Sequence, residues 1–150
     1  MVEVGSKGIK ARVFEFTKMN DGEAPDVKQK YSRDINTNLV QSMKDGRFTD
    51  VAILESTDAI AMLVGDMKEQ SGAKDDCLVV GSSGAAKALN TDELAASVAN
   101  KTGVLMDFIN PEQEAKYAMV AAIRPKRRPE SVLVARRMAT RPRPLKIKTT

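Results

Sequence analysis

Residues 77–87 read Cys-Leu-Val-Val-Gly-Ser-Ser-Gly-Ala-Ala-Lys, a short apolar run followed by a turn rich in glycine and serine. The run has no polar residue between its apolar ones, which is typical of an inner strand covered on both faces. Glycine and serine then favour a turn, and the alanines after them allow a helix to start. This order of elements predicts one unit of a layered α/β fold.

The same turn is a candidate loop for binding an anion. Backbone N–H groups between a strand and a helix can point toward a bound phosphate or carboxylate. The stretch is not a Walker A loop, because Gly84 is misplaced and alanines stand where that motif needs glycine and Ser/Thr. An ordinary turn is the simpler interpretation. The candidate anion-binding residues are Gly81, Ser82, Ser83, Gly84 and Lys87.

Further strands are predicted on both sides of this unit. Residues 9–17 alternate apolar and charged side chains, and the phenylalanines at 14 and 16 then use the opposite face, which suggests a bulge or a strand covered on both faces. Residues 48–54 and 104–109 are apolar enough for two more strands. Residues 20–34 are polar and contain turn formers, which predicts a long exposed loop.

Helical spacing and capping residues predict two helices before the quoted stretch. Asn36 can cap a short helix that closes at Gly46. A second helix is predicted to start at Ser56 or Thr57. Its buried face is formed by residues at helical spacing, namely Ile60, Leu63, Val64 and Met67.

Two further helices are predicted after the quoted stretch. Asn90 and Glu93 have the spacing of a capping box, and Gly103 marks the end of that helix. Asn110 can cap a helix that starts at the following proline, with Gln113 in the capping-box position. The alternative for this last segment is a hairpin, with residues 117–123 as its second strand. Together these elements predict a small layered α/β or α+β domain of four to five short strands and three to four helices, in an undecided strand order.

Charge and proline content change together at residue 124. Residues 124–150 contain ten basic residues, one acid and four of the six prolines. This segment therefore carries a net charge of +9, which leaves −5 for residues 1–123 out of the chain's +4. The change predicts an acidic globular domain over 1–123 and an extended basic arm over 124–150.

The basic arm is expected to bind a polyanion or a neighbouring subunit. Proline favours an extended chain, and arginine presents forked donors that suit phosphate. The arm has no aromatic residue on which bases can stack, so it would contact a nucleic-acid backbone independently of sequence. The residues proposed for this contact are Arg124, Lys126, Arg127, Arg128, Arg136, Arg137, Arg141, Arg143, Lys146 and Lys148.

The sequence therefore predicts a non-enzymatic protein that associates with nucleic acid. The first alternative is a structural protein of a virion or another large particle, whose arm binds neighbouring subunits; an oligomer or a larger assembly is expected. The second alternative is a metal-dependent nuclease built on Asp107, Glu114 and Lys116. That site would need Glu114 and Lys116 on a strand beside Asp107, and hence the hairpin.

Several classes of site are excluded by composition. The chain has no histidine, which excludes Ser-His-Asp and Cys-His catalysis and every His-ligated metal site. Its one cysteine, Cys77, precedes aliphatic residues and is expected to be a buried, inert thiol. No cofactor and no metal site is predicted. No apolar stretch approaches the roughly 20 residues of a membrane span, and the N-terminus lacks a secretory pattern. We therefore expect no membrane partner and a location in the cytoplasm or in a particle assembled there.

Overall fold

The computed structural model describes residues 1–17, 25–71 and 77–123. The chain separates into two units, Met1–Lys116 and Tyr117–Thr150. Of the three α-helices in the described residues, the first unit contains two together with the sheet, and the third begins in it.

The predicted basic arm lies outside the described residues. Its boundary at residue 124, its ten cationic residues and the partners proposed for it therefore stay predictions.

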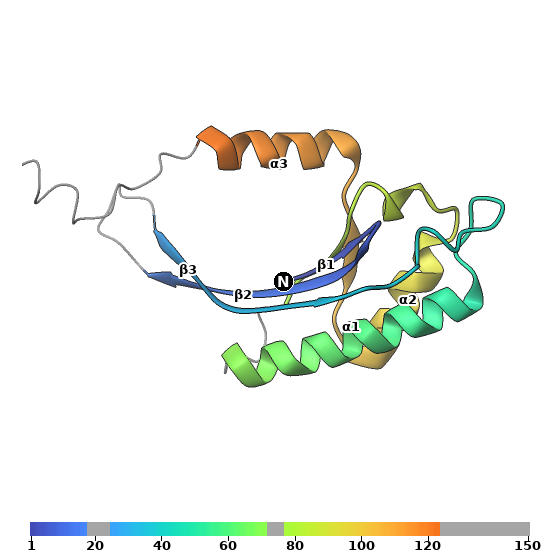
Figure 1. The fold of residues 1–150 in the computed structure, drawn as a ribbon, viewed down its shortest axis with the longest axis horizontal. Coiled ribbons are helices and arrows are strands. Elements are labelled where there is room, and N and C mark those ends of the chain that lie inside the picture. Colours follow the sequence, from blue (N-terminus) through green and yellow to red (C-terminus); the bar gives the residue numbers. More distant parts are fainter. Residues whose placement is uncertain (18–24, 72–76, 124–150) are drawn as a thin grey trace, which may run out of the picture. The chain divides into compact units, whose positions relative to one another are not determined.

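A five-stranded mixed sheet forms the centre of the first unit (Figure 1). Its order is β3-β2-β1-β4-β5. The strands β3, β2 and β1 pair antiparallel, whereas β1, β4 and β5 run parallel. The bounds of the strands are β1 Val2–Gly5, β2 Gly8–Thr17, β3 Asp26–Ile35, β4 Val79–Gly81 and β5 Met106–Phe108. This mixed architecture confirms the predicted fold class.

Helices α1 and α2 lie on the same side of the sheet (Figure 1). The bounds of the helices are α1 Asp50–Ser71, the short 3-10 helix η1 Ala85–Lys87, α2 Thr91–Thr102 and α3 Pro111–Ile123. α1 connects β3 to β4, and α2 lies in the connection from β4 to its parallel neighbour β5, because parallel strands need a crossover of this kind. Among the described residues, none of the helices combines the length and the apolar character needed to cross a membrane.

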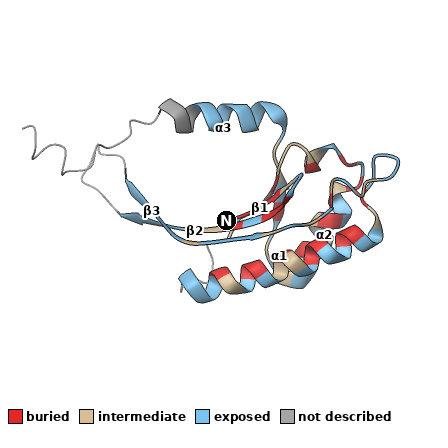
Figure 2. Ribbon diagram, in the orientation of Figure 1, coloured by how far each residue is buried: buried red, intermediate tan, exposed pale blue. Residues whose placement is uncertain are grey.

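The hydrophobic core lies between α1, α2 and the sheet, as the buried residues in Figure 2 show. The predicted apolar face of the second helix is confirmed, because all four of its residues are buried in α1. They pack in one cluster with aliphatic residues of the sheet that include Val2, Val4, Ile9 and Val79. Burying each such side chain stabilises the fold by about 1.5–3 kcal/mol, so this aliphatic cluster holds α1 on the sheet.

The quoted strand is confirmed at the centre of the parallel part of the sheet. β4 pairs with β1 on one side and with β5 on the other. Val79 is fully buried, as the unbroken apolar run predicted. The strand predicted over 104–109 is confirmed as β5.

The irregularity predicted in residues 9–17 occurs as a register shift between Val13 and Phe14, but the additional residue lies on the partner strand β3. Val13 pairs with Tyr31 and Phe14 pairs with Gln29, so Lys30 is an additional residue on β3 at this point. A bulge locally increases the twist of a two-stranded segment. The far half of the β2–β3 ribbon is exposed.

The long loop predicted over 20–34 is wrong where the structure describes it, because β3 starts at Asp26. This edge strand has a burial pattern that is almost entirely exposed, so it lacks the apolar alternation by which strands are recognised. Its pairing with β2 stabilises it instead, together with Tyr31, which donates a hydrogen bond to Asp66 of α1 at 3.0 Å.

The helix predicted over 36–46 and the strand predicted over 48–54 are both wrong. Asp45 and Gly46 have positive φ and form the two central residues of a turn, in which Lys44 and Arg47 exchange backbone hydrogen bonds of 2.9 Å. Helix α1 already begins at Asp50, because Thr49 caps it through its hydroxyl, which accepts from the N–H of Ala52 at 3.3 Å.

The predicted start of the second helix at Ser56 or Thr57 is therefore also wrong. Both residues are buried inside α1. The Thr57 hydroxyl donates to the hydroxyl of Ser97 on α2 at 2.8 Å. A buried hydroxyl needs a hydrogen-bond partner. The Thr57–Ser97 bond therefore links α1 to α2, and Thr57 does not mark the start of a helix.

Asn90 precedes α2 as predicted, but its side chain does not cap that helix. Its carbonyl oxygen accepts from the N–H of Phe48 at 2.8 Å, and its amide nitrogen donates to the Phe48 carbonyl at 3.1 Å and to Glu93 at 2.7 Å. Asn90 is buried, and its amide is paired at both ends. It therefore ties the irregular segment before α1 to the start of α2.

The last predicted helix is confirmed as α3, and the hairpin alternative is wrong. The Asn110 carbonyl oxygen accepts from the Gln113 N–H at 2.8 Å, and the Gln113 side chain accepts from the Asn110 N–H at 2.9 Å. These two reciprocal bonds form a capping box, with Pro111 at the first helical position.

Candidate functional site

The carboxyl ends of the three parallel strands β1, β4 and β5 lie side by side. Val4 of β1 lies opposite Gly81 of β4, and Gly81 lies opposite Phe108 of β5. In open sheets with parallel strands, ligands bind outside the carboxyl ends of those strands. The segments that follow β1, β4 and β5 therefore lie where a ligand of such a sheet binds.

The turn after β4 is held by backbone hydrogen bonds on both sides. The N–H of Ser82 donates to the Val4 carbonyl at 2.9 Å, and the N–H of Ile109 donates to the Gly81 carbonyl at 3.0 Å. The ring of Phe108 covers Gly81 so closely that a Cβ there would lie 2.3 Å from Cδ1 of the ring. The candidate anion loop of the sequence is thus a rigid turn beside β1, and its Gly81 is required by packing.

A second turn, between β1 and β2, lies beside the first. Gly5 pairs with Gly8, which leaves Ser6 and Lys7 as its two central residues. Gly8 has φ +147, and a Cβ on it would lie 2.4 Å from the Ile35 carbonyl oxygen. A Cβ on Gly84 would lie 3.7 Å from the Cβ of Ser6, so the two turns lie close together.

Sequence reasoning missed this second turn. The signal was present as Gly-Ser-Lys-Gly between two apolar alternating segments, which is a pattern of a hairpin turn. It became a candidate part of the site only when the register placed it against Gly84.

Glu114 brings a carboxylate to the turn after β4. The N–H of Ser83 donates to its Oε2 at 3.2 Å. Hydrogen bonds from Ser83, from its side chain first and its backbone second, hold the pKa of Glu114 below its usual range. The residue is therefore ionised at neutral pH. It lies in the first turn of α3, where the capping box orients the helix and the positive end of the helix dipole favours an acid.

Lysines flank both turns. Lys7 is one of the two central residues of the β1–β2 turn, and Lys87 is the last residue of η1. Both are exposed. Backbone N–H groups, serine hydroxyls and nearby ammonium groups are the donors with which proteins hold phosphate. Of the predicted anion loop, Gly81 ends β4, Ser82, Ser83 and Gly84 follow it in the turn, and Lys87 ends η1.

The nuclease arrangement is wrong because Glu114 and Lys116 lie on a helix. Asp107 lies on β5 and is exposed, while Glu114 bonds to Ser83. The three residues do not share neighbouring strands, which the nuclease hypothesis required. Within the described residues no group of three or more Cys, Asp or Glu side chains gathers that could hold a metal ion.

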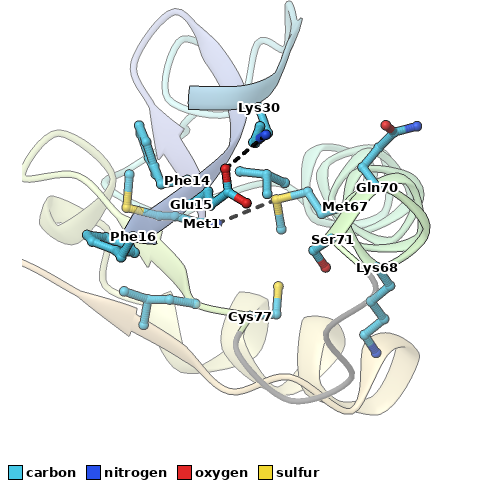
Figure 3. Close-up of a pocket in the computed structure, with 12 residues that line it drawn as sticks. Met1, Phe14, Glu15, Phe16, Lys30, Met67, Lys68, Gln70, Ser71 and Cys77 are labelled. Atoms are coloured by element: carbon cyan, nitrogen blue, oxygen red, sulfur yellow. Dashed lines mark hydrogen bonds and ion pairs between the residues drawn. The ribbon is translucent and has the colours of Figure 1, made fainter. Parts of the chain in front are cut away.

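A cavity, drawn in Figure 3, lies near Met1 and Leu78, which precede β1 and β4 at the amino ends of the same strands. Its volume is about 770 Å3, and its lining includes Met1 before β1, Leu78 before β4 and the last turns of α1. Phe14, Phe16 and Met67 make much of its surface apolar. At its rim the Lys30 ammonium forms an ion pair with Glu15 at 2.9 Å, which lowers the pKa of that carboxyl.

Cys77 also lines this cavity and is half-buried. Burial raises the pKa of its thiol, so the thiol stays protonated at neutral pH. Because the thiolate is the nucleophile, a protonated thiol reacts slowly, as expected, although Cys77 is half-buried and not fully buried as the sequence suggested. The cavity therefore combines apolar surface with the Glu15–Lys30 ion pair and with polar side chains of Lys68, Gln70 and Ser71.

Comparison with known proteins gives likeness in structure alone. No protein-family model matches the chain, and no curated protein sequence matches it. Among solved structures, an Aquifex aeolicus member of the Ppx/GppA family has a TM-score of 0.67 at 20% identity, over 83% of this chain and 40% of its own. The Aquifex aeolicus Ppx/GppA phosphatase type II variant gives 0.65 at 20% identity with the same coverage. An exopolyphosphatase from Cytophaga hutchinsonii gives 0.61 at 16% identity, over 77% of this chain and 35% of its own.

This likeness corrects the function predicted from the basic arm. The neighbours are phosphatases and an exopolyphosphatase, so the prediction of a non-enzymatic nucleic-acid-binding protein is wrong, as are the virion and nuclease alternatives. The wrong function was predicted from the net charge of the arm. The turns that form the candidate site come together only in the folded protein, so composition does not reveal them. The chain spans about two fifths of the length of the Aquifex structures and shares the fold of that part of the Ppx/GppA phosphatases.

Proposed function

We propose that this chain is the phosphate-binding part of a phosphatase of the Ppx/GppA type, acting on terminal phosphoryl groups of polyphosphate-like substrates. The observation that carries the proposal is the meeting of Glu114 with the glycine-serine turn at the carboxyl ends of parallel strands. The shared fold with phosphatases supports it.

The two turns would hold the phosphoryl group. The hydroxyls of Ser6, Ser82 and Ser83 and the N–H groups around them are donors for its oxygens. Lys7 and Lys87 would add positive charge that offsets the charge of the phosphate chain. Because phosphoryl transfer needs mainly positioning and charge stabilisation, rigid turns of this kind supply most of what the reaction requires.

Glu114 would orient the water that attacks phosphorus. In this step the water oxygen forms a bond to phosphorus, the bond from phosphorus to the bridging oxygen breaks, and the proton of the water passes to the carboxylate. The proton then leaves to solvent or to the released phosphate chain. A positioned carboxylate base of this kind contributes about 10²- to 10⁴-fold to a rate.

Binding and hydrolysis test the proposal separately. Calorimetry with tripolyphosphate should show binding that weakens about fivefold for each of Ser82→Ala and Ser83→Ala, since each hydroxyl bond is worth about 1 kcal/mol. Ser32→Ala, an exposed serine of β3, is the matched control. Phosphate release from polyphosphate, with and without magnesium, should fall at least about 100-fold in Glu114→Ala.

Two outcomes would contradict parts of this function. Tripolyphosphate binding that is absent, or equally strong in all serine variants, would show that the turns are not the site. Tight binding without any phosphate release would remove the catalytic role of Glu114 and leave a phosphate-binding domain.

A further inference from the structure

We propose that Glu114 competes with the ligand of the turn site, because its carboxylate takes the Ser83 N–H that a bound phosphoryl oxygen would use. The inference rests on the proposed function for the identity of the ligand. It adds that the site without ligand is closed by a side chain of the protein itself, and that binding exchanges one anionic group for another.

The contact itself is the first evidence. Glu114 Oε2 lies 3.2 Å from the Ser83 nitrogen, in the middle of the Gly81–Gly84 turn. Carboxylate and phosphoryl oxygens are both anionic acceptors that favour the same N–H donors. A backbone N–H can serve only one strong acceptor well, so the two groups exclude each other at this donor.

The position of Glu114 allows such an exchange. The capping box of Asn110 and Gln113 holds the backbone of the first turn of α3, while the Glu114 side chain is exposed. The side chain can therefore rotate away from Ser83 without any change in the helix. The released carboxylate remains beside the turn, close to the place where an attacking water would lie.

The exchange also changes the basicity of Glu114. Its bonds with Ser83 lower the pKa of the carboxyl, so the group is a weaker base while the site is empty. Loss of those bonds to an incoming phosphoryl group removes that effect, and the negative charge of the ligand raises the pKa further. Ligand binding would thus prepare Glu114 to accept a proton from water.

This competition predicts an effect opposite to that of an ordinary binding residue. Removal of the carboxylate should strengthen anion binding while it abolishes hydrolysis. A residue that merely supports the fold of the turn would weaken both when it is removed.

The test compares two acids of the same helical turn. Glu112 and Glu114 both lie in the first turn of α3, and both changes to alanine remove one negative charge. Binding of tripolyphosphate and of inorganic phosphate is measured by calorimetry for the full chain, for Glu114→Ala and for Glu112→Ala, at one pH and one ionic strength. We expect about fivefold tighter binding in Glu114→Ala, which corresponds to one hydrogen bond regained, and less than about twofold in Glu112→Ala.

The outcomes separate this inference from the proposed function. Equal effects of the two changes, or weaker binding in Glu114→Ala, would overturn the competition and leave the phosphate site in place. Tighter binding in Glu114→Ala from a protein that never releases phosphate would support the competition and reject the catalytic step. Absence of binding in all three proteins would reject both. Unfolding curves for each variant confirm that every comparison is made between folded proteins.

Discussion

The two ends of the parallel strands β1 and β4 differ in what they offer a ligand. At the amino ends lies a cavity of about 770 Å3 with apolar walls, a protonated thiol and an ion pair that neutralises its own charges. At the carboxyl ends lie two small turns with serines, lysines and a carboxylate that accepts from an uncharged N–H. The cavity and the cluster of polar groups thus lie at opposite ends of these strands. The two turns at the carboxyl ends are the better candidate for the site of a reaction.

The largest expected effect comes from Gly8, at the carboxyl end. Gly8→Ala places a Cβ 2.4 Å from the Ile35 carbonyl oxygen at φ +147, so we expect a loss of about 3 kcal/mol in the free energy of unfolding. Urea denaturation measures it. Gly84→Ala is the control in the neighbouring turn, because its φ is −67 and the nearest atom to its Cβ is at 3.7 Å, and it should change stability by less than about 0.5 kcal/mol. Similar losses in the free energy of unfolding for Gly8→Ala and Gly84→Ala would contradict the close approach of Gly8 to Ile35.

The Met67→Ala variant tests whether a change in the cavity at the amino ends of β1 and β4 affects the turns at the carboxyl ends of these strands. Met67→Ala removes a side chain that is 4% exposed, and we expect a loss of about 2–3 kcal/mol together with a larger cavity. Met62→Ala on the same helix, where the side chain is 45% exposed, should cost far less. Tripolyphosphate binding should be the same in both. A change in binding that is specific to Met67→Ala would show that the two ends are coupled.

The Asn110→Ala variant tests whether the capping box holds the first turn of α3, which carries Glu114. Asn110→Ala removes one half of the capping box and should cost about 1 kcal/mol, with faster hydrogen exchange in the first turn of α3. Asn100→Ala, at an exposed position of α2, should be neutral or slightly stabilising because alanine is the better helix former. Equal losses for the two changes would mean that the box does not hold the helix start.

The smallest effect concerns pH. The pKa of Glu114 is lower in the folded protein than its unfolded value of 4.5, so its contact with Ser83 stabilises the fold above that pH. This stabilisation is lost as pH falls through the lowered pKa, where the folded carboxyl takes up its proton. The stability difference between the natural chain and Glu114→Gln should therefore shrink between about pH 5 and pH 3. Glu112→Gln provides the control, and a difference that stays constant for Glu114→Gln would contradict the contact.

The parts of the fold that sequence predicted are those where local pattern and tertiary packing agree. Val79 sits in an unbroken apolar run and became a central strand, and Asn110 with Gln113 formed the capping box that their spacing indicates. β3 was missed because pairing with β2, and not its own polar residues, makes it a strand. Phe48 was read as a strand residue, although its backbone N–H and carbonyl pair with the side-chain amide of Asn90, 42 residues away, and not with a strand.

The candidate site was predicted only in part, for a related reason. The Gly81–Gly84 turn was recognisable because a strand, a turn and a helix start are contiguous in the chain. Glu114 was noticed as well, but as a nuclease ligand beside Asp107, since spacing alone does not say which element carries a residue. Its actual neighbour, Ser83, is 31 residues earlier, and the parallel register of β4 and β5 brings the two together.

The side-chain amide of Asn90 makes the link between the segment before α1 and helix α2 sensitive to deamidation of one residue. Its nitrogen donates to the Phe48 carbonyl and to Glu93, at 3.1 and 2.7 Å. Hydrolysis of that amide to an acid would put an oxygen in place of the nitrogen, opposite two other oxygens, in a buried position. Deamidation of Asn90 would therefore weaken the link between the segment before α1 and the start of α2.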